Sequence, residues 1–291
     1  MAELDVVVVG GVGVDTIVRV GDLPLPVEDT IKVPPIRRYV GHTGNGVAMG
    51  CHALGLRTHF ADVIGDDPDG ALVLEHYRRV GLPFSHHVHP SGTRCAVNLV
   101  DRNGQRTSLY DGRHPDGMTV DPSLYRPLLR RTRHVHVSIV DWARDALAAT
   151  EGVSTSTDLH NWDGVSEFRQ DFAYGADLVF LSAGKLGDRM PAVVDDIFRR
   201  GRAKVVVVMD GGRGSHLCLP DSAPLHVPPV PVECVVDTNG AGDSYVAGFL
   251  YAFLMGREWG ACARAGAAAG AHAVRSAGTH TSFISAAELG L

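Results

Sequence analysis

The sequence predicts a three-layer α/β/α fold, in which helices cover a mostly parallel β-sheet and a small antiparallel β lid is attached. Three observations lead to this prediction. Short β-branched runs recur along the chain, helical patterns lie between several of them, and two turn-rich segments interrupt the alternation. Strands that alternate with helices in this way pair in parallel, with the helices as crossover connections.

The predicted strands are short, continuous apolar runs. The first is Val6–Val9, which ends in a pair of glycines, and similar runs follow at His134–Val140, Leu178–Leu181 and Val205–Met209. A short run without polar alternation is typical of a strand that is buried on both faces. These segments are therefore expected to form the centre of the sheet.

The predicted helices are recognised by apolar residues at steps of three and four. The last two are long, and the final one is rich in alanine and glycine, which favours close packing. The expected helices are Ala48–Leu54, Gly70–Val80, Met190–Arg199, Ser244–Met255 and Trp259–Arg275.

Two segments, at about residues 16–40 and 93–110, do not follow the alternation. The first holds several prolines and short β-like pieces such as Thr30–Val33, and the second reads TRCAVNLVDRNGQRTSLY, with a hairpin turn predicted at Asn103-Gly104. We interpret both as a lid inserted into one domain that spans residues 1–291. The alternative is two surface excursions without a function.

Composition excludes several classes of protein. Apolar residues make up 45% and charged residues 21% of the 291 residues, and the net charge is −6 without a long basic run. This argues against binding to nucleic acids or to acidic membranes. No apolar run is long enough for a membrane span, the N-terminus lacks the basic region of a signal peptide, and five scattered cysteines favour a reducing cytoplasm.

The stretch VVDTNGAGDSYVAGFL places a glycine loop at the start of a predicted helix. The backbone N–H groups of a first helical turn have no intrahelical acceptor and carry the positive end of the helix dipole. Gly240–Asp243 is therefore expected to bind an anion such as phosphate. Asp243 itself has two interpretations: it caps the helix, or it accepts the proton of a hydroxyl that attacks the bound phosphate.

The segment DTNGAGDSYVAGF resembles the C-terminal signature of the ribokinase family, also called PfkB-type carbohydrate kinases, and the resemblance extends over nearly the whole chain. It implies a ribokinase-like fold and ATP-dependent phosphorylation of an alcohol. In that interpretation Asp243 is the catalytic base, and Gly240, Ala241 and Gly242 form the anion hole around the transferred phosphate.

The resemblance also implies where the acceptor substrate binds. Asp15 follows the first strand, where the family places an Asp that binds substrate hydroxyls. The N-terminal signature, GHTGNGVAMGCHALG, is less faithful, because His42 follows Gly41 in place of a second glycine, and Gly46 falls at the usual Asn position with Asn45 one residue early. Asn45 and His42 are still expected to face the substrate.

On the nucleotide side, the family's Asn-x-x-Glu motif, which supports Mg²⁺, is replaced by Ser182 and Lys185 in LSAGKLGD. A cation therefore stands where a carboxylate is usual, and Lys185 either contacts a phosphate or is an exposed lysine. Mg²⁺ is still expected with ATP, because it bridges phosphate oxygens. The residues expected to bind the nucleotide are Ser182, Lys185, Asp210, Gly211, Gly214, Asn239, Gly240 and Gly242.

Two groups of residues in the sequence have the character of possible metal sites. Asp237, Gly278 and Ser282 fall where many relatives bind a monovalent cation such as K⁺. The group His86-His87-x-His89 has no carboxylate or cysteine partner at ligand spacing, so it is interpreted as a solvated loop. His160 and Trp162 follow a predicted strand end and could line the pocket, and Asp158 resembles a position that supports the active site in some relatives.

The predicted function is the phosphorylation of a small molecule, with a sugar as the first choice. A nucleoside is the alternative, since Tyr39, Phe84 or Tyr110 could stack on a base. A sugar phosphate is a further alternative, which Arg94 and Arg106 of the lid would bind, although lid arginines are usually solvated. A non-catalytic ligand sensor on the same fold is less favoured, because the glycine loop and Asp243 are retained.

Other nucleotide-binding folds are not supported. The segment GGVGVDT lacks the third glycine of a dinucleotide-binding motif, and no Walker A loop is present. The expected partners are thus a small-molecule substrate and, because lids of this type often pair at their edges, a second copy of the chain as a homodimer.

Overall fold

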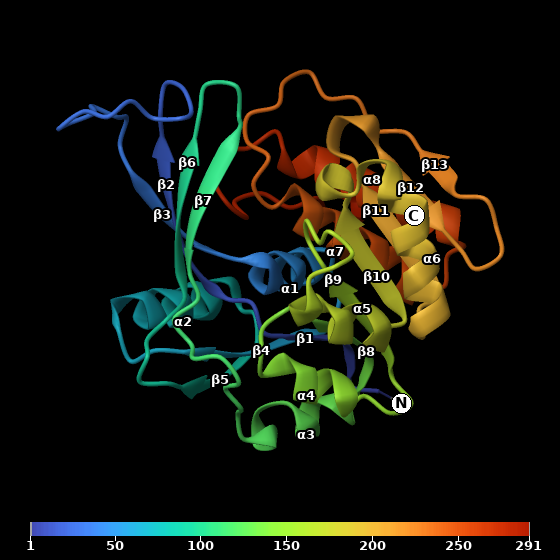
Figure 1. Cartoon of the computed structure of the whole chain (residues 1–291). Coiled ribbons are helices and arrows are strands. Elements are labelled where there is room, and N and C mark those ends of the chain that lie inside the picture. The colour runs from blue at the N-terminus through green and yellow to red at the C-terminus, as the bar shows by residue number, and fades with distance from the viewer. Residues whose placement is uncertain (1, 291) are drawn as a thin grey trace.

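The computed structural model describes residues 2–290 and contains a nine-stranded sheet with the order β13-β12-β11-β10-β9-β8-β1-β4-β5 (Figure 1). The seven strands from β5 to β11 are parallel, and the two strands at the β13 edge are antiparallel. The strands are β1 Leu4–Val9, β4 Thr58–Ile64, β5 Phe84–Val88, β8 Thr132–Val137, β9 Ser154–Asp158, β10 Leu178–Ser182, β11 Val205–Met209, β12 Ser215–Cys218 and β13 Leu225–Val227.

A second, four-stranded sheet forms the lid and has the order β3-β2-β6-β7. Its strands are β2 Gly13–Arg19, β3 Arg37–Gly41, β6 Cys95–Val100 and β7 Arg106–Asp111. The pairs β2–β3 and β6–β7 are antiparallel, whereas β2 and β6 run parallel. The lid is thus built from two antiparallel pairs joined by one parallel pairing, and it rises beside the main sheet in Figure 1.

Helices cover both faces of the main sheet, so the α/β/α arrangement is confirmed. Side chains of a strand alternate between the two faces, and accordingly Val6 and Val8 pack into one core with α1, α2, α7 and α8, while Val7 and Val9 pack into the other with α3–α6. The helices are α1 Thr43–Ala53, α2 Pro68–Val80, α3 Arg126–Leu129, α4 Ala143–Ala148, α5 Gln170–Gly175, α6 Met190–Arg200, α7 Ala241–Leu254, α8 Trp259–Ala273 and α9 Ala286–Leu289.

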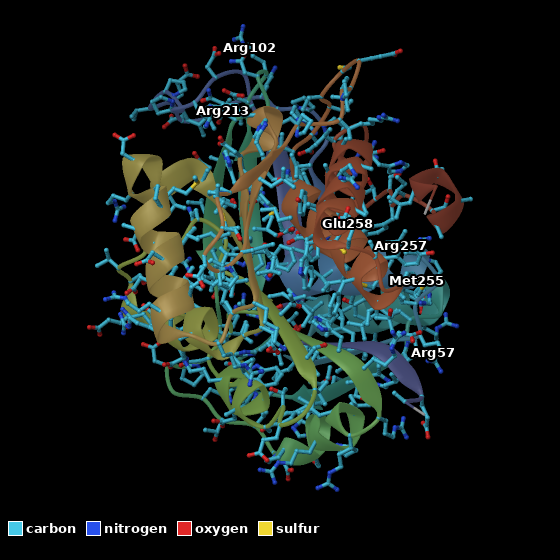
Figure 2. All side chains as sticks on the ribbon, turned by 90° about the vertical axis from the view of Figure 1, so that its right-hand side faces the viewer. Arg57, Arg102, Arg213, Met255, Arg257 and Glu258 are labelled. Atoms are coloured by element: carbon cyan, nitrogen blue, oxygen red, sulfur yellow. The ribbon has the colours of Figure 1, made fainter. Side chains whose placement is uncertain are left out.

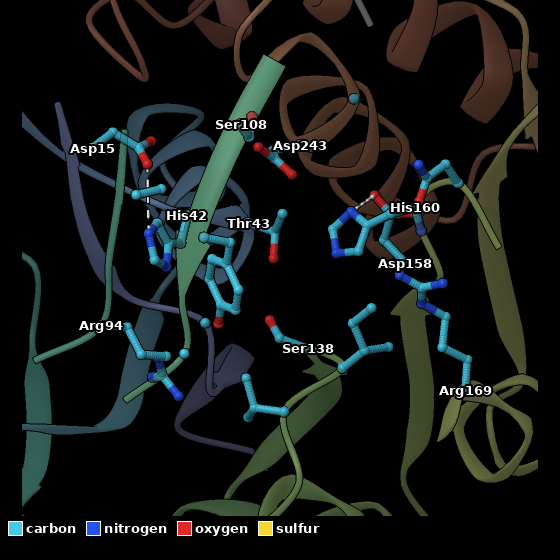
Figure 3. Close-up of a pocket in the computed structure, with 18 of the residues that line it drawn as sticks. Asp15, His42, Thr43, Arg94, Ser108, Ser138, Asp158, His160, Arg169 and Asp243 are labelled. Atoms are coloured by element: carbon cyan, nitrogen blue, oxygen red, sulfur yellow. Dashed lines mark hydrogen bonds and ion pairs between the residues drawn. The ribbon is translucent and has the colours of Figure 1, made fainter. Parts of the chain in front are cut away.

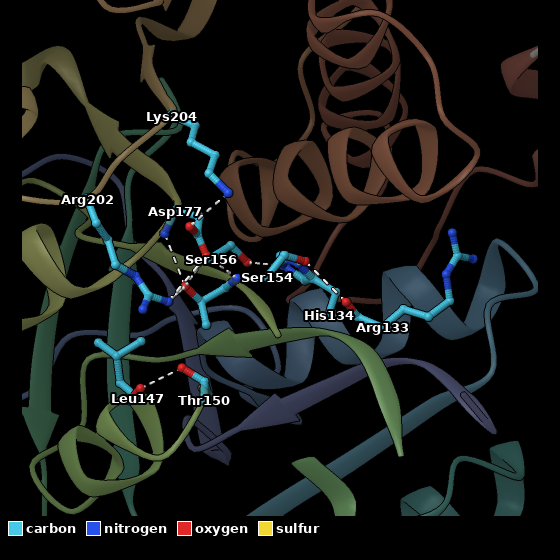
Figure 4. Close-up of polar contacts among 10 residues, drawn as sticks. Arg133, His134, Leu147, Thr150, Ser154, Ser156, Asp177, Arg202 and Lys204 are labelled. Atoms are coloured by element: carbon cyan, nitrogen blue, oxygen red, sulfur yellow. Dashed lines mark hydrogen bonds and ion pairs between the residues drawn. The ribbon is translucent and has the colours of Figure 1, made fainter. Parts of the chain in front are cut away.

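One central strand, β9, is polar although it is buried. Its sequence is STSTD, and hydroxyl groups on this strand bond to neighbouring strands. Ser156 contacts both His134 and His136 of β8, and Thr155 contacts Asp177 before β10 (Figure 4). Hydrogen bonding of this kind removes most of the penalty for burying polar groups.

The structure corrects three sequence-based expectations. Thr30–Val33 forms no strand, since its backbone pairs with neither sheet. The strand β4 was not predicted, and β9 was predicted only as a strand end before His160, because neither shows a continuous apolar run. His86 and His87 lie in the edge strand β5, not in a loop, and no group of three or more His, Cys, Asp or Glu residues suited to a metal occurs within residues 2–290.

The carboxyl ends of the parallel strands face the lid, and ligands bind at this edge in open α/β sheets. Figure 2 places Arg102, in the β6–β7 turn, and Arg213, after β11, at the same end of the molecule, whereas Arg57 at the start of β4 lies away from it. Among the described residues, no helix combines the length and the apolar character that a membrane span requires.

Candidate active site

A cavity of about 790 Å³ lies between the carboxyl ends of the strands and the lid. The lid contributes Asp15, Asn98, Ser108 and Tyr110, and the ends of β8, β9, β10 and β11 contribute Ser138, Asp158, Ser182 and Met209. Gly240, Gly242 and Asp243 line it from the start of α7. In Figure 3, Asp15 and His42 stand on one side, Asp158 and His160 on the other, with Asp243 and Ser138 between them.

The start of α7 presents free backbone donors beside Asp243. Gly240 adopts a left-handed conformation at φ 78°, and the helix has no side-chain cap. The first bond of the helix runs from the Ser244 N–H to the Gly240 carbonyl. Gly242 and Asp243 precede that bond, and within residues 2–290 their N–H groups have no acceptor. This arrangement suits an anion.

Asp243 is nearly buried and accepts one hydrogen bond from His280. The Asp243 Oδ2–His280 Nε2 distance is 2.8 Å, whereas the described residues offer Oδ1 no donor. The His280 side chain is only 2% exposed, so it stands behind the carboxylate and not in the solvent. One oxygen of Asp243 is thus held, and the other is left for a ligand.

A chain of hydrogen bonds determines which nitrogen of His280 carries the proton. The Asn45 amide nitrogen donates to the Val40 carbonyl and also lies 2.9 Å from His280 Nδ1, while the Tyr77 hydroxyl donates to Asn45 Oδ1. A carbonyl can only accept, so the amide orientation is fixed and His280 Nδ1 must accept. The proton is therefore on Nε2, which donates it to Asp243.

This network corrects the expectation for Asn45 and Gly46. Asn45 is fully buried and does not line the cavity, because its amide is used by Val40, Tyr77 and His280. A Cβ at position 46 would lie 2.2 Å from His280 Nε2 and 2.5 Å from the Asp243 Cβ. Glycine at this position therefore allows Asp243 and His280 to pack against α1.

Asp15 and His42 line the cavity, and their contact with a substrate stays a prediction. His42 Nε2 lies 3.4 Å from Asp15 Oδ1, too far for a good hydrogen bond, and it has no other partner. Burial lowers the pKa of His42 to about 4, so the ring is neutral at pH 7. Gly41 does not line the cavity, because the Asp15 carboxylate occupies the place of its missing Cβ.

Two lid arginines, Arg94 and Arg106, are engaged by protein groups, although Arg106 is exposed. Arg94 is 2% exposed and forms a buried ion pair with Asp62, while its Nε donates to the Val12 carbonyl. Arg106 donates to the Asn239 side chain. Both guanidinium groups are therefore engaged by protein atoms, although both residues border the cavity.

The walls of the cavity contain unsatisfied polar atoms. Seven buried side-chain nitrogen or oxygen atoms in residues 2–290 lack a hydrogen-bond partner, and six of them belong to residues that line this cavity. Buried polar groups are nearly always paired in folded proteins, so this concentration points to a polar ligand. The six residues are His42, His114, Ser138, Trp142, Arg169 and Thr279.

Asp158 and Ser182 line the side of the cavity opposite Asp15, together with His160. Burial raises the pKa of Asp158, and the nearby Asp243 carboxylate adds to this effect. Asp158 Oδ1 accepts a hydrogen bond from the His160 N–H. Lys185 is exposed in a short 3₁₀ turn after β10 and does not line this cavity, so its contact with a nucleotide stays a prediction.

The remaining nucleotide-side residues form turns outside the cavity. Asp210 is held by Arg213, and Gly211 and Gly214 adopt positive φ angles in the β11–β12 turn. None of these three lines the cavity, and Ala241 does not either. Contact of the turn with a nucleotide remains a prediction.

The side chains of Asp237 and Ser282, which were predicted to bind a monovalent cation, form hydrogen bonds with other residues. Asp237 is 1% exposed and accepts from Arg19, Asn239 and the Gly278 N–H. The Ser282 hydroxyl lies 2.9 Å from His272 Nε2. Asn239 is held by Asp237 and Arg106 and does not reach the cavity. The arrangement does not fit a cation that needs free oxygen ligands.

Sequence reasoning missed His280 as the partner of Asp243, together with Thr279, Ser138 and Arg169. Ser138 carried a usable signal, since it directly follows β8 at the carboxyl edge of the sheet. His280 and Thr279 lie in the segment Gly-Thr-His-Thr-Ser, in which the family resemblance assigned roles only to Gly278 and Ser282. Nothing in the sequence around Arg169 indicates the site.

Comparison with known proteins gives consistent results. Residues 177–286 match the pfkB family carbohydrate kinases. The chain is 43% identical over 290 residues, 98% of this chain and 97% of the other, to the acarbose 7(IV)-phosphotransferase of Actinoplanes sp.. It is 54% identical to the solved structure of the microbiome-derived acarbose kinase Mak1, with a TM-score of 0.94 over 99% of this chain and 98% of that one.

A more distant likeness concerns the fold alone. The ribokinase of Arabidopsis thaliana, solved with ribose and ATP, has a TM-score of 0.80 over 99% of this chain and 98% of its own, at 24% identity. The ribokinase-like fold with its lid is thereby confirmed.

Proposed function

Because the chain belongs to the pfkB family of carbohydrate kinases and is a phosphotransferase with an alcohol acceptor, we propose that it transfers the terminal phosphoryl group of ATP to a hydroxyl of acarbose. Two acarbose kinases resemble it along almost their whole length. The sugar class of the acceptor follows from the family, and the choice of acarbose is supported by these two relatives.

The observation that carries this proposal is the set of six cavity residues with unpaired buried polar atoms. A polyhydroxylated acceptor suits such a lining, because each of its hydroxyl groups can both donate and accept a hydrogen bond. Leaving such an atom unpaired costs about 1–3 kcal/mol, so these atoms favour a ligand that pairs with several of them. A cavity of about 790 Å³ has room for more than one sugar ring.

Asp243 acts as the general base in this proposal. Oδ2 is held by His280, and Oδ1 is free to accept the proton of the attacking hydroxyl as its oxygen bonds to phosphorus. The bond between phosphorus and the ADP oxygen breaks in the same step. Positioning dominates in phosphoryl transfer, because its transition state is loose. His280 is a positioning residue that fixes the carboxylate plane.

The start of α7 stabilises the negative charge of the transferred group through the N–H groups of Gly242 and Asp243. Mg²⁺, supplied with ATP, would neutralise negative charge on the phosphates. Among the residues of this chain, Asp158 would hold that ion, because it is a buried carboxylate that lines the cavity. Burial raises the pKa of Asp158, and a nearby cation would favour its charged form.

The alternative acceptors receive less support. Of the three aromatic residues considered for a nucleoside base, only Tyr110 lines the cavity, while Phe84 packs in the core against Phe60 and Tyr77. For a sugar phosphate, Arg94 and Arg106 are already bound to Asp62 and Asn239.

A homodimer through the lid and a cytoplasmic location are part of the proposal. All six residues of the edge strand β7 are exposed, including Leu109 at 60% and Tyr110 at 61%. An unpaired, partly apolar edge can pair with the same edge of a second copy. Sedimentation equilibrium would measure the assembly, and a monomer at micromolar concentration would contradict it. Five free cysteines agree with a reducing compartment.

The test of the proposed function is ADP release with acarbose, ribose, adenosine and fructose 6-phosphate as acceptors. The expected result is a kcat/KM for acarbose at least about 100-fold above the others, because acarbose offers the most hydroxyl groups to the polar lining of the cavity. Mass spectrometry of the product identifies the phosphorylated acceptor. Equal or better turnover of adenosine or fructose 6-phosphate would replace the proposal by the corresponding alternative.

The assignment of Asp158 is tested by a Mg²⁺ titration. Asp158→Asn removes the charge and keeps the shape, and it is expected to raise the Mg²⁺ concentration at half-maximal rate about tenfold. Lys185→Glu, outside the cavity, is the matched control and should leave the titration unchanged. A shift in the Lys185 variant without one in the Asp158 variant would contradict the assignment.

A further inference from the structure

Asp237 lies three residues before the anion-hole glycine and is almost completely buried. Its Oδ1 accepts from the Asn239 backbone N–H at 3.0 Å and from the Asn239 side-chain amide at 2.7 Å. Its Oδ2 accepts from Arg19 Nη2 at 2.7 Å and from the Gly278 N–H at 3.2 Å. A carboxylate has about four lone-pair positions, so all of them are used.

One of these four donors is a full positive charge. A buried carboxylate requires such a partner, because desolvation of an unpaired charge is very unfavourable. Among the described residues, Arg19 supplies the single ion pair of Asp237. A second cation at this carboxylate would lack a lone pair and would be repelled by the guanidinium.

The arginine comes from the lid. Arg19 is the last residue of β2, and Arg106, the first residue of β7, bonds to Asn239 in the same loop. Two lid strands therefore hold the segment from Asp237 to Asn239, which leads directly into the anion hole at Gly240.

We propose that Arg19 supplies the positive charge that holds the loop before the anion hole, so that the reaction needs no monovalent cation and depends on the lid for the order of this loop. Arg19 is a positioning residue: it contacts Asp237 and not the cavity. The inference rests on the proposed kinase function for its effect on turnover, but not for its effect on cation binding.

The first test uses the wild-type protein. Turnover is measured in KCl, NaCl and choline chloride at constant ionic strength, and the three rates are expected to agree within twofold. The thermal midpoint is measured in the same salts and is expected to be equal in KCl and choline chloride. More than fivefold activation by K⁺, or stabilisation specific to K⁺, would overturn the proposal.

The second test separates charge from packing. Arg19→Lys keeps a charged donor and should retain activity within about threefold, whereas Arg19→Met keeps only the apolar stem and should lose at least about tenfold in kcat. Arg102→Met, at the lid tip, where Arg102 bonds to Asp22 and to the Gly21 carbonyl, is the matched control and should behave like the wild type. An Arg19→Met variant as active as the wild type would contradict the proposal.

These experiments distinguish the two proposals from each other. If the wild-type protein phosphorylates no acceptor in any salt, the proposed function fails, and the thermal measurements in KCl and choline chloride still decide the question of the cation. If it is an active kinase that K⁺ activates, only the inference about Arg19 fails.

Discussion

Asp237 and Asp243 are both buried, lie six residues apart on the same loop and helix, and differ in how many donors they receive. Asp237 accepts four hydrogen bonds, one of them from a guanidinium, and it does not border the cavity. Asp243 accepts one, from His280, and lines the cavity with its other oxygen free.

The difference separates an anchoring carboxylate from a reactive one. A carboxylate whose lone pairs are all used stabilises the local backbone, but it cannot accept another proton without losing a bond. A carboxylate with one held and one free oxygen is oriented and still able to accept a proton. The number and the direction of the donors, rather than burial alone, distinguish the two roles.

Replacement of Asp243 by Asn is expected to give the largest effect. Loss of a general base typically lowers the rate by a factor of 10²–10⁴, and a 10³-fold loss of kcat corresponds to about 4 kcal/mol. Binding of ATP, measured by calorimetry, should remain within a few-fold of the wild-type value. A variant with more than a tenth of the wild-type kcat would contradict the role of Asp243 as base.

Replacement of Asp237 by Asn should instead lower stability. The amide leaves Arg19 without its counter-charge and turns an N–H group toward other donors, so the free energy of unfolding is expected to fall by about 3 kcal/mol. Urea denaturation measures this loss, with Asp243→Asn as the comparison variant expected to lose less than about 1 kcal/mol. Equal stability of the two variants would remove the distinction between them.

Acid should destabilise the protein through two buried histidines, His134 and His136. Burial lowers the pKa of His134 and of His136 to about 3, whereas an unfolded histidine titrates near 6.5. Below pH 6.5 only the unfolded state gains protons at these positions, so stability is complete above pH 6.5 and falls with pH.

At pH 5 the expected loss is about 2 kcal/mol for each of these two histidines. Urea denaturation at pH 7 and pH 5 measures it, and His136→Asn should reduce the pH dependence. A free energy of unfolding that is constant from pH 7 to pH 5 would contradict this account of His134 and His136.

Replacement of His280 by Gln tests the single hydrogen bond that distinguishes Asp243 from the fully bonded Asp237. The variant loses the geometry of the Nε2–H donor to Asp243, and kcat is expected to fall about tenfold, or about 1.4 kcal/mol, with little change in KM for ATP. Tyr77→Phe, one bond further along the chain of hydrogen bonds, should fall by less than about threefold. An equal loss in both variants would indicate a general packing defect.

Most of the fold followed from local patterns. The apolar runs at β1, β10 and β11 and the helical pattern of α7 coincide with the observed elements to within three residues. The strand β4, which was not predicted, lacks such an apolar run. The polar strand β9 is stabilised by side-chain bonds to residues of β8 and to Asp177, and such partners are distant in the sequence.

The residues of the candidate site were predictable where they belong to one continuous sequence motif. The glycine loop and Asp243 form one continuous motif, and Asp15 lies in β2, a few residues after the first strand. Asn45 was assigned to the substrate because of its place in the motif, but the structure gives its amide to Val40, His280 and Tyr77. A motif identifies a residue type and a position, whereas side-chain direction depends on what packs around it.

The sequence by itself determined the class of the fold, the anion-binding start of α7 and the acid beside it, because these depend on periodicity and on neighbours within a few residues. The tertiary structure alone decided which oxygen of Asp243 is free, that Arg19 forms an ion pair with Asp237, and that Lys185 lies outside the cavity. The physical reason is that a hydrogen-bond donor acts over about 3 Å in space, and the donors in question come from segments 37 and 218 residues away.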